Sequence, residues 1–598
     1  MVSRAPERTE SNPPQSEPPK TELTRPRWEL RDWLAAAALF AATAAVVLWQ
    51  NAHVAVLFDL SYILNTAERI ALGQIPYRDF PLAHAPLTFF IQAAIIRLTG
   101  RVFFHHVLYV AVTGGLGTVL AWRIALASLR GRVAAAWTLA FLLAAPLIFL
   151  GIYCIVPTPE YDCDCGFWLL VAIWAFTQLD RRKSAAFAFA AGALACVPMF
   201  FKQNMGLPFL IAAVGGVLLL LVLKGLFRTQ TPAAAPDARS LFAFLGGACA
   251  ALLAALLALH STAGFGNYLH WTIQYAGQRR MPGLSLMLGV YRDPTLAWTL
   301  PCVAVALVFL WLGPKRLWTQ IAAFALLSAP FIFTLASLLI YDDADERGDS
   351  LLALWPLLLL LAAGLALTNL FTLRRQISLR VFLPLLLLAA IHGTFLSQQL
   401  WGSTYGIWPL LILLIAELLA FLGPFAARAS EHRWFTPALT AIISVTVLVC
   451  GGFYTASEER LNYANLSDGP AEHSAFPALA GLATPGPYLP EIDELLRYAA
   501  ANIPFDDGIV LIPGEEPFYF ATGRTPEFPV PFFDPTIDPY SPNEIADLVR
   551  ARNIRWLIVK TDIQTKEDPT PDRAELMQLL TQQFTPAANL RGYDVYRR

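Results

Sequence analysis

Charged residues are scarce in this chain of 598 residues. Asp, Glu, Lys and Arg make up 15% of it, whereas hydrophobic residues make up 56% and the mean hydropathy is +0.51. A soluble core could not bury so much apolar surface, so the composition excludes an ordinary water-soluble protein. The net charge of -1 lacks the basic excess typical of nucleic-acid-binding proteins, and we expect no nucleic acid among the partners. The chain is therefore predicted to be a polytopic α-helical membrane protein.

Cysteine is also rare, with seven residues scattered along the sequence. Cys163 and Cys165 form a C-x-C pair, but no second Cys or His pair stands at a zinc-binding spacing. The sequence therefore gives little support for a structural zinc site. A divalent cation held by oxygen ligands stays open, because residues 157–164 are rich in carboxylates.

About thirteen apolar runs have the length of roughly 17 to 25 residues that a bilayer core requires. Turns rich in Lys and Arg alternate with turns poorer in them, which predicts a cytoplasmic N-terminus and an extracytoplasmic C-terminus. The expected spans are residues 29–49, 104–128, 133–152, 165–180, 184–201, 205–223, 240–260, 296–313, 318–340, 350–372, 381–397, 406–424 and 437–454.

Composition changes near both ends of the chain. Residues 1–27 are rich in Pro, Ser, Glu and Arg and predict a disordered cytoplasmic tail. Residues 28–456 carry the spans, and residues 457–486 have the Gly, Pro and Ala content of a linker. Residues 487–598 alternate helical and β-rich runs, which predicts a small extracytoplasmic α/β domain. Its expected elements are helices at 491–502 and 541–552, strands at 508–512 and 554–560, and a helix after Pro571.

Residues 51–101, between the first two spans, are too polar to cross a membrane and too apolar to leave it. Carboxylates, arginines and aromatics at the membrane edge suit an enzyme whose substrate has a lipid tail and a charged head. Asp59, just after the first span, could accept a proton from an acceptor hydroxyl as a general base. A solvated or helix-capping Asp is the alternative interpretation of the same residue.

A second acidic cluster, which includes Glu160 and Asp162, is expected on the same side of the membrane. It could orient an acceptor, bind a divalent cation or be an ordinary acidic loop. Lys202 lies between two apolar spans, where a lysine is costly unless it pairs, binds an anion or extends to the interface. The other external cations, candidates for anion binding, are Arg279, Arg280, Arg292 and Arg347.

These residues together resemble the GT-C superfamily of membrane glycosyltransferases. The nearest pattern is the branch with protein O-mannosyltransferases and bacterial lipid A aminoarabinose transferases, and the expected spans and external α/β domain are similar to that branch too. The residues that carry the resemblance are Asp59, Tyr62, Gly73, residues 76–80, Pro86 and Leu87, then the acidic second loop, then Lys202 and Gln203.

The resemblance implies transfer of a sugar from a polyprenyl-phosphate donor, with inversion, to a lipid, glycan or protein on the periplasmic side of a bacterial-type inner (plasma) membrane. Asp59 would match the family's first-loop acidic residue, and Glu160 or Asp162 that of the second loop. Cations would bind the leaving phosphate, since neutralising developing charge is a large catalytic term. Candidates for the donor phosphate are Lys202, Arg279, Arg280, Arg347 and His84, and candidates for substrate contact are Tyr62, Tyr77, Arg78 and Asp79.

Two other classes of function remain. A flippase or transporter of lipid-linked sugars would share the hydrophobic body and the external cations but would not need Asp59. Transporters often place ionisable groups at the midplane of two related halves, and this sequence has no such repeat. A noncatalytic scaffold would tolerate the loss of both acidic segments.

Overall fold

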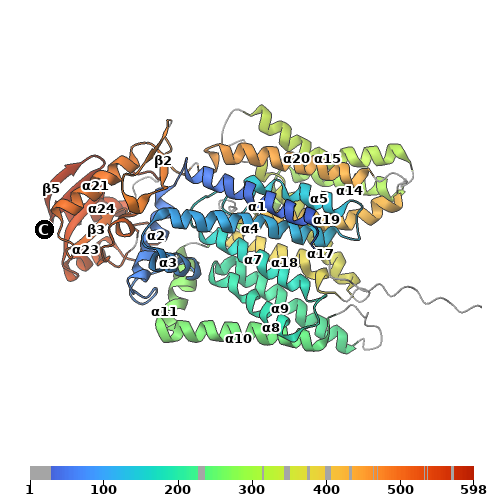
Figure 1. The fold of residues 1–598 in the computed structure, drawn as a ribbon, viewed down its shortest axis with the longest axis horizontal. Helices are drawn as coiled ribbons and strands as arrows, with labels where there is room; N and C mark the ends of the chain where they lie inside the picture. The colour runs from blue at the N-terminus through green and yellow to red at the C-terminus, as the bar shows by residue number, and fades with distance from the viewer. Residues whose placement is uncertain are drawn as a thin grey trace, which may run out of the picture.

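Long apolar helices make up most of the computed structural model, and a small α/β unit lies at one end of the helical bundle (Figure 1). The structure describes residues 28–226, 236–279, 281–312, 316–341, 350–373, 378–396, 406–429, 434–461, 463–467, 469–530, 532–534, 537–566 and 571–598. The predicted cytoplasmic tail, residues 1–27, lies outside these ranges.

The prediction of a polytopic α-helical membrane protein is confirmed. Within the described ranges, eight segments are long and apolar enough to cross a bilayer, and four apolar helices are shorter, so the predicted count of thirteen spans stays a prediction. Six of the eight are single helices, namely α1 (Leu30–Asn51), α4 (Phe103–Leu129), α9 (Gln203–Leu226), α10 (Ala238–Thr262), α15 (Leu317–Ile340) and α20 (Phe435–Ala456). The seventh, Ser350–Thr372, contains α17 (Trp355–Thr372). The eighth, Leu379–Leu396, consists of η4 (Leu379–Phe382), α18 (Leu383–Gly393) and η5 (Thr394–Leu396). The shorter ones are α3 (Leu87–Thr99), α8 (Ala185–Cys196) with η1 (Val197–Phe200), α14 (Leu296–Leu312) and the part Trp408–Pro424 of α19 (Trp408–Ala429).

Two expected spans differ from the structure. The run 133–152 is divided into α5 (Ala136–Ala144) and α6 (Leu147–Leu150), with Pro146 between them, because proline lacks the N–H that a continuing helix needs. The span expected from residue 165 begins earlier, as α7 (Tyr161–Gln178). Carboxylates are favourable in the first turn of a helix, so the acidic residues start α7 and do not form a loop before it.

The predicted external segments also fold into helices. Residues 51–101 contain α2 (Leu57–Ala71) and α3, which pack against each other beside the α/β unit (Figure 1). Between α10 and α14 the chain forms short helical pieces, namely α11 (Phe265–Leu269), η2 (His270–Tyr275), α12 (Ala276–Arg279), α13 (Leu284–Met287) and η3 (Gly289–Arg292).

The C-terminal α/β unit has a four-stranded sheet whose strands lie in the order β3 (Gly508–Ile512), β4 (Ile554–Lys560), β6 (Tyr593–Arg597) and β5 (Thr585–Leu590). β3 and β4 are parallel, and the other pairs are antiparallel. The predicted helices and strands are confirmed, whereas β5 and β6 had no counterpart in the prediction. Residues 457–486, predicted as a linker, carry η7 (Glu459–Leu461), η8 (Pro477–Leu479) and the antiparallel pair β1 (Ala471–His473) and β2 (Ala483–Pro485). The other elements are α21 (Tyr488–Asn502), β3 (Gly508–Ile512), α22 (Phe518–Thr522), α23 (Pro542–Ala551), β4 (Ile554–Lys560), α24 (Pro571–Thr581), β5 (Thr585–Leu590) and β6 (Tyr593–Arg597).

The two faces of this sheet belong to different cores, as the alternation of side chains along a strand requires. Val510 and Leu557 face α23 and α24. Leu511 and Ile558 belong to a second core, shared with α21, α22, α2 and α3. The α/β unit and the external helices of the membrane part therefore have one continuous hydrophobic core.

Candidate functional site

Asp59 lies in the first turn of α2, the helix between the membrane part and the α/β unit. Its side chain is partly exposed, and its Oδ2 accepts a hydrogen bond of 2.8 Å from the Tyr463 hydroxyl. Tyr463 follows α20 within the predicted linker, so sequence reasoning gave no signal for this contact.

The second acidic segment meets Lys202 in a buried cluster at the start of α7. Glu160 is the N-cap residue of α7, and Asp162 is in its first turn. Lys202 lies between η1 and α9 and forms an ion pair with Asp162. All three side chains are buried, and the Lys202 ammonium also lies 5.5 Å from the centre of the Tyr161 ring. The lysine that the sequence singled out as costly is therefore compensated by a carboxylate.

Asp59 and the second acidic segment are far apart in the sequence but influence one another electrostatically at this cluster. Burial raises the pKa of the Glu160 carboxyl well above its usual value. The charges of Asp59 and Asp162 raise this pKa further, whereas Lys202 acts in the opposite direction. The charge of Asp59 therefore acts on Glu160, which lies in the buried cluster with Asp162 and Lys202.

The pKa of Glu160 predicts how stability depends on pH. A carboxyl with a higher pKa in the folded than in the unfolded state makes the free energy of unfolding fall as pH rises between the two values. We expect Glu160→Gln to become more stable relative to wild type as pH rises from about 4.3, the usual glutamate value, through the range in which the buried carboxyl ionises, by about 1.4 kcal/mol per unit of pKa difference. Thermal unfolding of both purified proteins across this range measures the effect, and parallel pH dependence in the two would contradict it.

Aromatic side chains line the cluster. The Tyr62 hydroxyl and His84 Nδ1 are 2.9 Å apart, and the His84 ring lies 4.3 Å from the Tyr161 ring. The Tyr77 hydroxyl donates to the His84 carbonyl at 2.7 Å, and Tyr77 has a φ of 69°, which a non-glycine residue rarely adopts. The structure thus brings the sequence-predicted Tyr62, Tyr77 and His84 together, and Tyr161 is a member that the sequence did not single out.

Other predicted site residues lie elsewhere. The Arg78 guanidinium bonds to the Asp79 carboxylate at 2.9 Å, and Asp79 also accepts from the Ile75 N–H at 2.7 Å. The Arg78–Asp79 pair therefore stabilises the exposed turn in which both residues lie. A substrate role for Arg78 and Asp79 stays a prediction. Arg280 and Arg347 lie outside the described residues, and only the backbone of Arg279 is described.

Asp164 has a structural environment that differs from that of its acidic neighbours. It is fully buried and accepts hydrogen bonds from Thr88 Oγ1 at 2.8 Å, Tyr109 OH at 2.5 Å and Tyr153 OH at 2.6 Å. These bonds join the start of α7 to α3 and α4. Asp164 thereby fixes the backbone that presents Glu160 and Asp162.

The described part of the chain contains neither a metal-binding cluster nor a disulfide bond. There, no group of three or more His, Cys, Asp or Glu side chains is arranged to hold a metal ion. All seven cysteines are free thiols.

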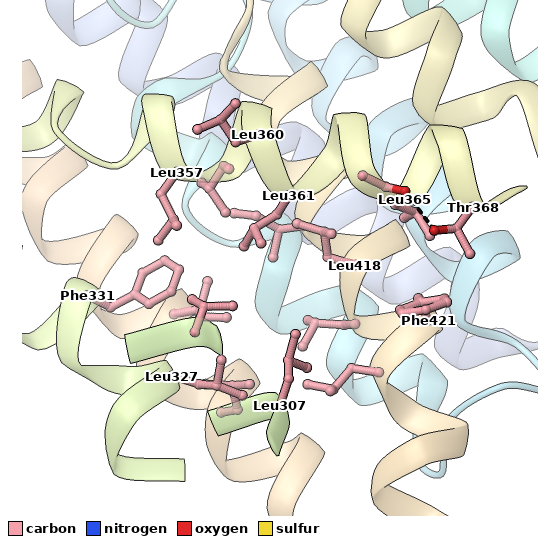
Figure 2. Close-up of a pocket in the computed structure, with 18 residues that line it drawn as sticks. Leu307, Leu327, Phe331, Leu357, Leu360, Leu361, Leu365, Thr368, Leu418 and Phe421 are labelled. Carbon is pink, nitrogen blue, oxygen red and sulfur yellow. Dashed lines mark hydrogen bonds between the residues drawn. The ribbon is translucent and has the colours of Figure 1, made fainter. Parts of the chain in front are cut away.

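An apolar cavity of about 330 Å³ lies among α14, α15, α17, α19 and α20 (Figure 2). Leucine side chains dominate its wall, with Phe331 and Phe421 among them. Its polar member, Thr368, donates its hydroxyl to the Gly364 carbonyl of the same helix at 2.8 Å. A cavity of this kind suits hydrocarbon and offers no partner to a charged head group, so we assign no chemistry to it.

Comparison with solved structures gives matches along most of the chain. The archaeal oligosaccharyltransferase AglB from Archaeoglobus fulgidus, in complex with an inhibitory peptide and a dolichol-phosphate, aligns over 89% of this chain and 70% of its own, with 12% identity and a TM-score of 0.46. ArnT from Cupriavidus metallidurans, bound to undecaprenyl phosphate, aligns over 95% of this chain and 98% of its own, with 14% identity and a TM-score of 0.42. No protein-family model matches the chain, and no curated protein has a matching sequence.

Proposed function

We propose that this protein is a membrane glycosyltransferase. It moves a sugar from a polyprenyl-phosphate donor to a hydroxyl group of an envelope lipid, glycan or protein, with inversion at the anomeric carbon. The observation that carries the proposal is that α2, the helix of Asp59, contacts the buried Asp162–Lys202 pair through Tyr62, His84 and Tyr161. A base, further carboxylates and a cation at one point are the groups that such a transfer requires.

In the proposed reaction, the Asp59 carboxylate accepts the proton of the acceptor hydroxyl. The acceptor oxygen attacks the anomeric carbon, and the bond from that carbon to the phosphate oxygen breaks as the new bond forms. The leaving group is the polyprenyl phosphate, which keeps the electrons of the broken bond. A single displacement of this kind inverts the configuration and needs no covalent intermediate on the protein.

Lys202 is the described cation best suited to the leaving phosphate. Negative charge grows on the phosphate as the bond breaks, and a positive charge held in a buried site stabilises it more than in water. The ion pair with Asp162 holds the Lys202 ammonium in place and leaves further N–H donors on Lys202 for a phosphate. The Tyr161 ring beside Lys202, and the His84 ring packed against Tyr161, would exclude water from the sugar.

The orientation proposed from the charge pattern puts the N-terminus in the cytoplasm and this site on the outer face of an inner (plasma) membrane. Asp59, Lys202 and the α/β unit would then share the compartment of the envelope acceptors. The donor would enter from the outer leaflet.

The purified protein in proteoliposomes tests the proposal directly. We expect label to pass from polyprenyl-phosphate donors carrying a labelled sugar to envelope acceptors, and the labelled product to identify the acceptor. A matched sample measures translocation of the same donor across the bilayer. Translocation without transfer, over several donor sugars, would overturn the proposal in favour of a flippase.

A further inference from the structure

The α/β unit contacts one face of α2, the helix that carries Asp59. The contacting residues of α2 are spaced four apart, which puts them on a single stripe of the helix. The hydrogen bonds are Leu57 N–H to Gln564 Oε1 (2.7 Å), Ser61 Oγ to the Glu515 carbonyl (2.5 Å), Asn65 Nδ2 to the Glu516 carbonyl (3.0 Å) and an Arg69 guanidinium N–H to the Phe528 carbonyl (2.6 Å).

Gln564 acts as a remote N-cap for α2. The N-cap position of this helix is Val56, whose side chain offers no acceptor to the free N–H groups of the first turn. Gln564, 507 positions from Leu57 in sequence, accepts that Leu57 N–H with Oε1. Its Nε2 donates to the Ala55 carbonyl at 3.1 Å and to Thr484 Oγ1 at 3.2 Å. The α/β unit thus supplies the hydrogen-bond acceptor that the N-cap residue Val56 lacks.

A buried ion pair holds Gln564 in this position. Lys560 Nζ lies 3.0 Å from Glu515 Oε2, and both side chains are fully buried. The same carboxylate accepts from the backbone N–H groups of Gln564 at 2.8 Å and Thr565 at 3.0 Å. Because Glu515 is paired and bonded to these amides, the loop after β4 is fixed where it meets α2.

The same loop holds Tyr463. Residues 463–465 run antiparallel to residues 564–566, with hydrogen bonds from Asn465 N–H to the Gln564 carbonyl at 2.5 Å and from Lys566 N–H to the Tyr463 carbonyl at 3.0 Å. The Tyr463 hydroxyl then donates to Asp59. Gln564 and Tyr463 therefore hold the backbone and the carboxylate of the same helical turn.

We propose that Tyr463 and Gln564 are positioning residues, through which the α/β unit orients Asp59 for proton transfer. This inference rests on the glycosyltransferase function proposed above and assigns a role to the α/β unit in the reaction. A hydroxyl that donates to a carboxylate favours its ionised form and restricts its rotation. A capped first turn keeps that carboxylate at a fixed depth relative to Lys202.

Tyr463→Phe removes the hydroxyl alone and is the sharpest variant. We expect kcat to fall about tenfold, as loss of a charge-assisted hydrogen bond allows, with the KM for the lipid donor unchanged within about twofold. The acid limb of the pH–rate profile should move to higher pH, because the carboxylate loses a donor to its charged form. Tyr498→Phe, in α21 of the same unit, is the matched control and should behave as wild type.

Gln564→Met supplies a second measurement that does not depend on catalysis. Hydrogen exchange of the first-turn amides of α2 should become faster than in wild type, while exchange in the sheet stays the same. If wild type is active and Tyr463→Phe matches Tyr498→Phe in kcat and pH profile, the positioning role is wrong and the proposed function stands. If wild type transfers no sugar, hydrogen exchange still tests whether Gln564 holds the first turn of α2. Unchanged exchange in Gln564→Met would show that it does not, whereas faster exchange would support this contact.

Discussion

Asp59→Asn should reduce sugar transfer by about a hundredfold to ten-thousandfold, the range of a lost general base. The amide keeps the shape of the carboxylate and can still accept the hydrogen bond from Tyr463. It cannot accept the proton of the acceptor hydroxyl at neutral pH. Because helix α2 keeps its other contacts, we expect the variant to insert and fold as wild type does. Transfer of labelled sugar in membranes with matched expression measures the effect.

A control substitution at another carboxylate distinguishes loss of the catalytic base from a general loss of negative charge. Asp506→Asn changes a carboxylate in the turn before β3, outside the site, and should leave the rate within a factor of about two. If Asp59→Asn retained the activity of Asp506→Asn, Asp59 would not be the base. A translocation activity that persisted in Asp59→Asn without any transfer would favour the flippase.

Lys202→Ala should have two separable effects. The first is on stability, because removal of one partner leaves the buried Asp162 without its countercharge, at a cost of about 3–5 kcal/mol. The second is on catalysis, because the leaving phosphate loses its cation, and we expect use of the lipid donor to fall by about a hundredfold or more. Thermal unfolding and donor-dependent transfer rates measure the two effects in the same preparation.

The double variant Lys202→Ala with Asp162→Asn separates these effects. It has no uncompensated charge at the pair, so most of the lost stability should return while transfer stays low. Lys224→Ala, toward the other end of α9, is the matched control for loss of a lysine from this region and should transfer sugar as wild type does. Full donor use by the double variant would show that the donor phosphate does not rely on Lys202.

Several parts of the fold could be predicted because their signals are local. Apolar length identifies membrane helices, and the alternation of helical and β-rich runs gave α21, α23, β3 and β4 close to their observed bounds. The edge strand β5 and its neighbour β6 follow a helix without comparable apolar runs, so this signal was weak there. The division at Pro146 and the early start of α7 depend on local backbone chemistry, which a count of apolar residues does not register.

Local sequence patterns predict the hydrophobic body, the α/β unit and the residue types of the candidate site. Asp59, Glu160 and Asp162 could be chosen from their places in the external acidic segments and from the superfamily resemblance, and Lys202 because an unpaired charge between apolar spans is costly. The contacts between charged side chains depend on three-dimensional packing, which pairs Lys202 with Asp162, places three hydroxyl donors around Asp164 and turns Arg78 toward Asp79. The contacts from Tyr463 and Gln564 to α2 span more than four hundred residues of chain. Such contacts follow from the packing of the sheet onto α2, and no local pattern specifies that packing.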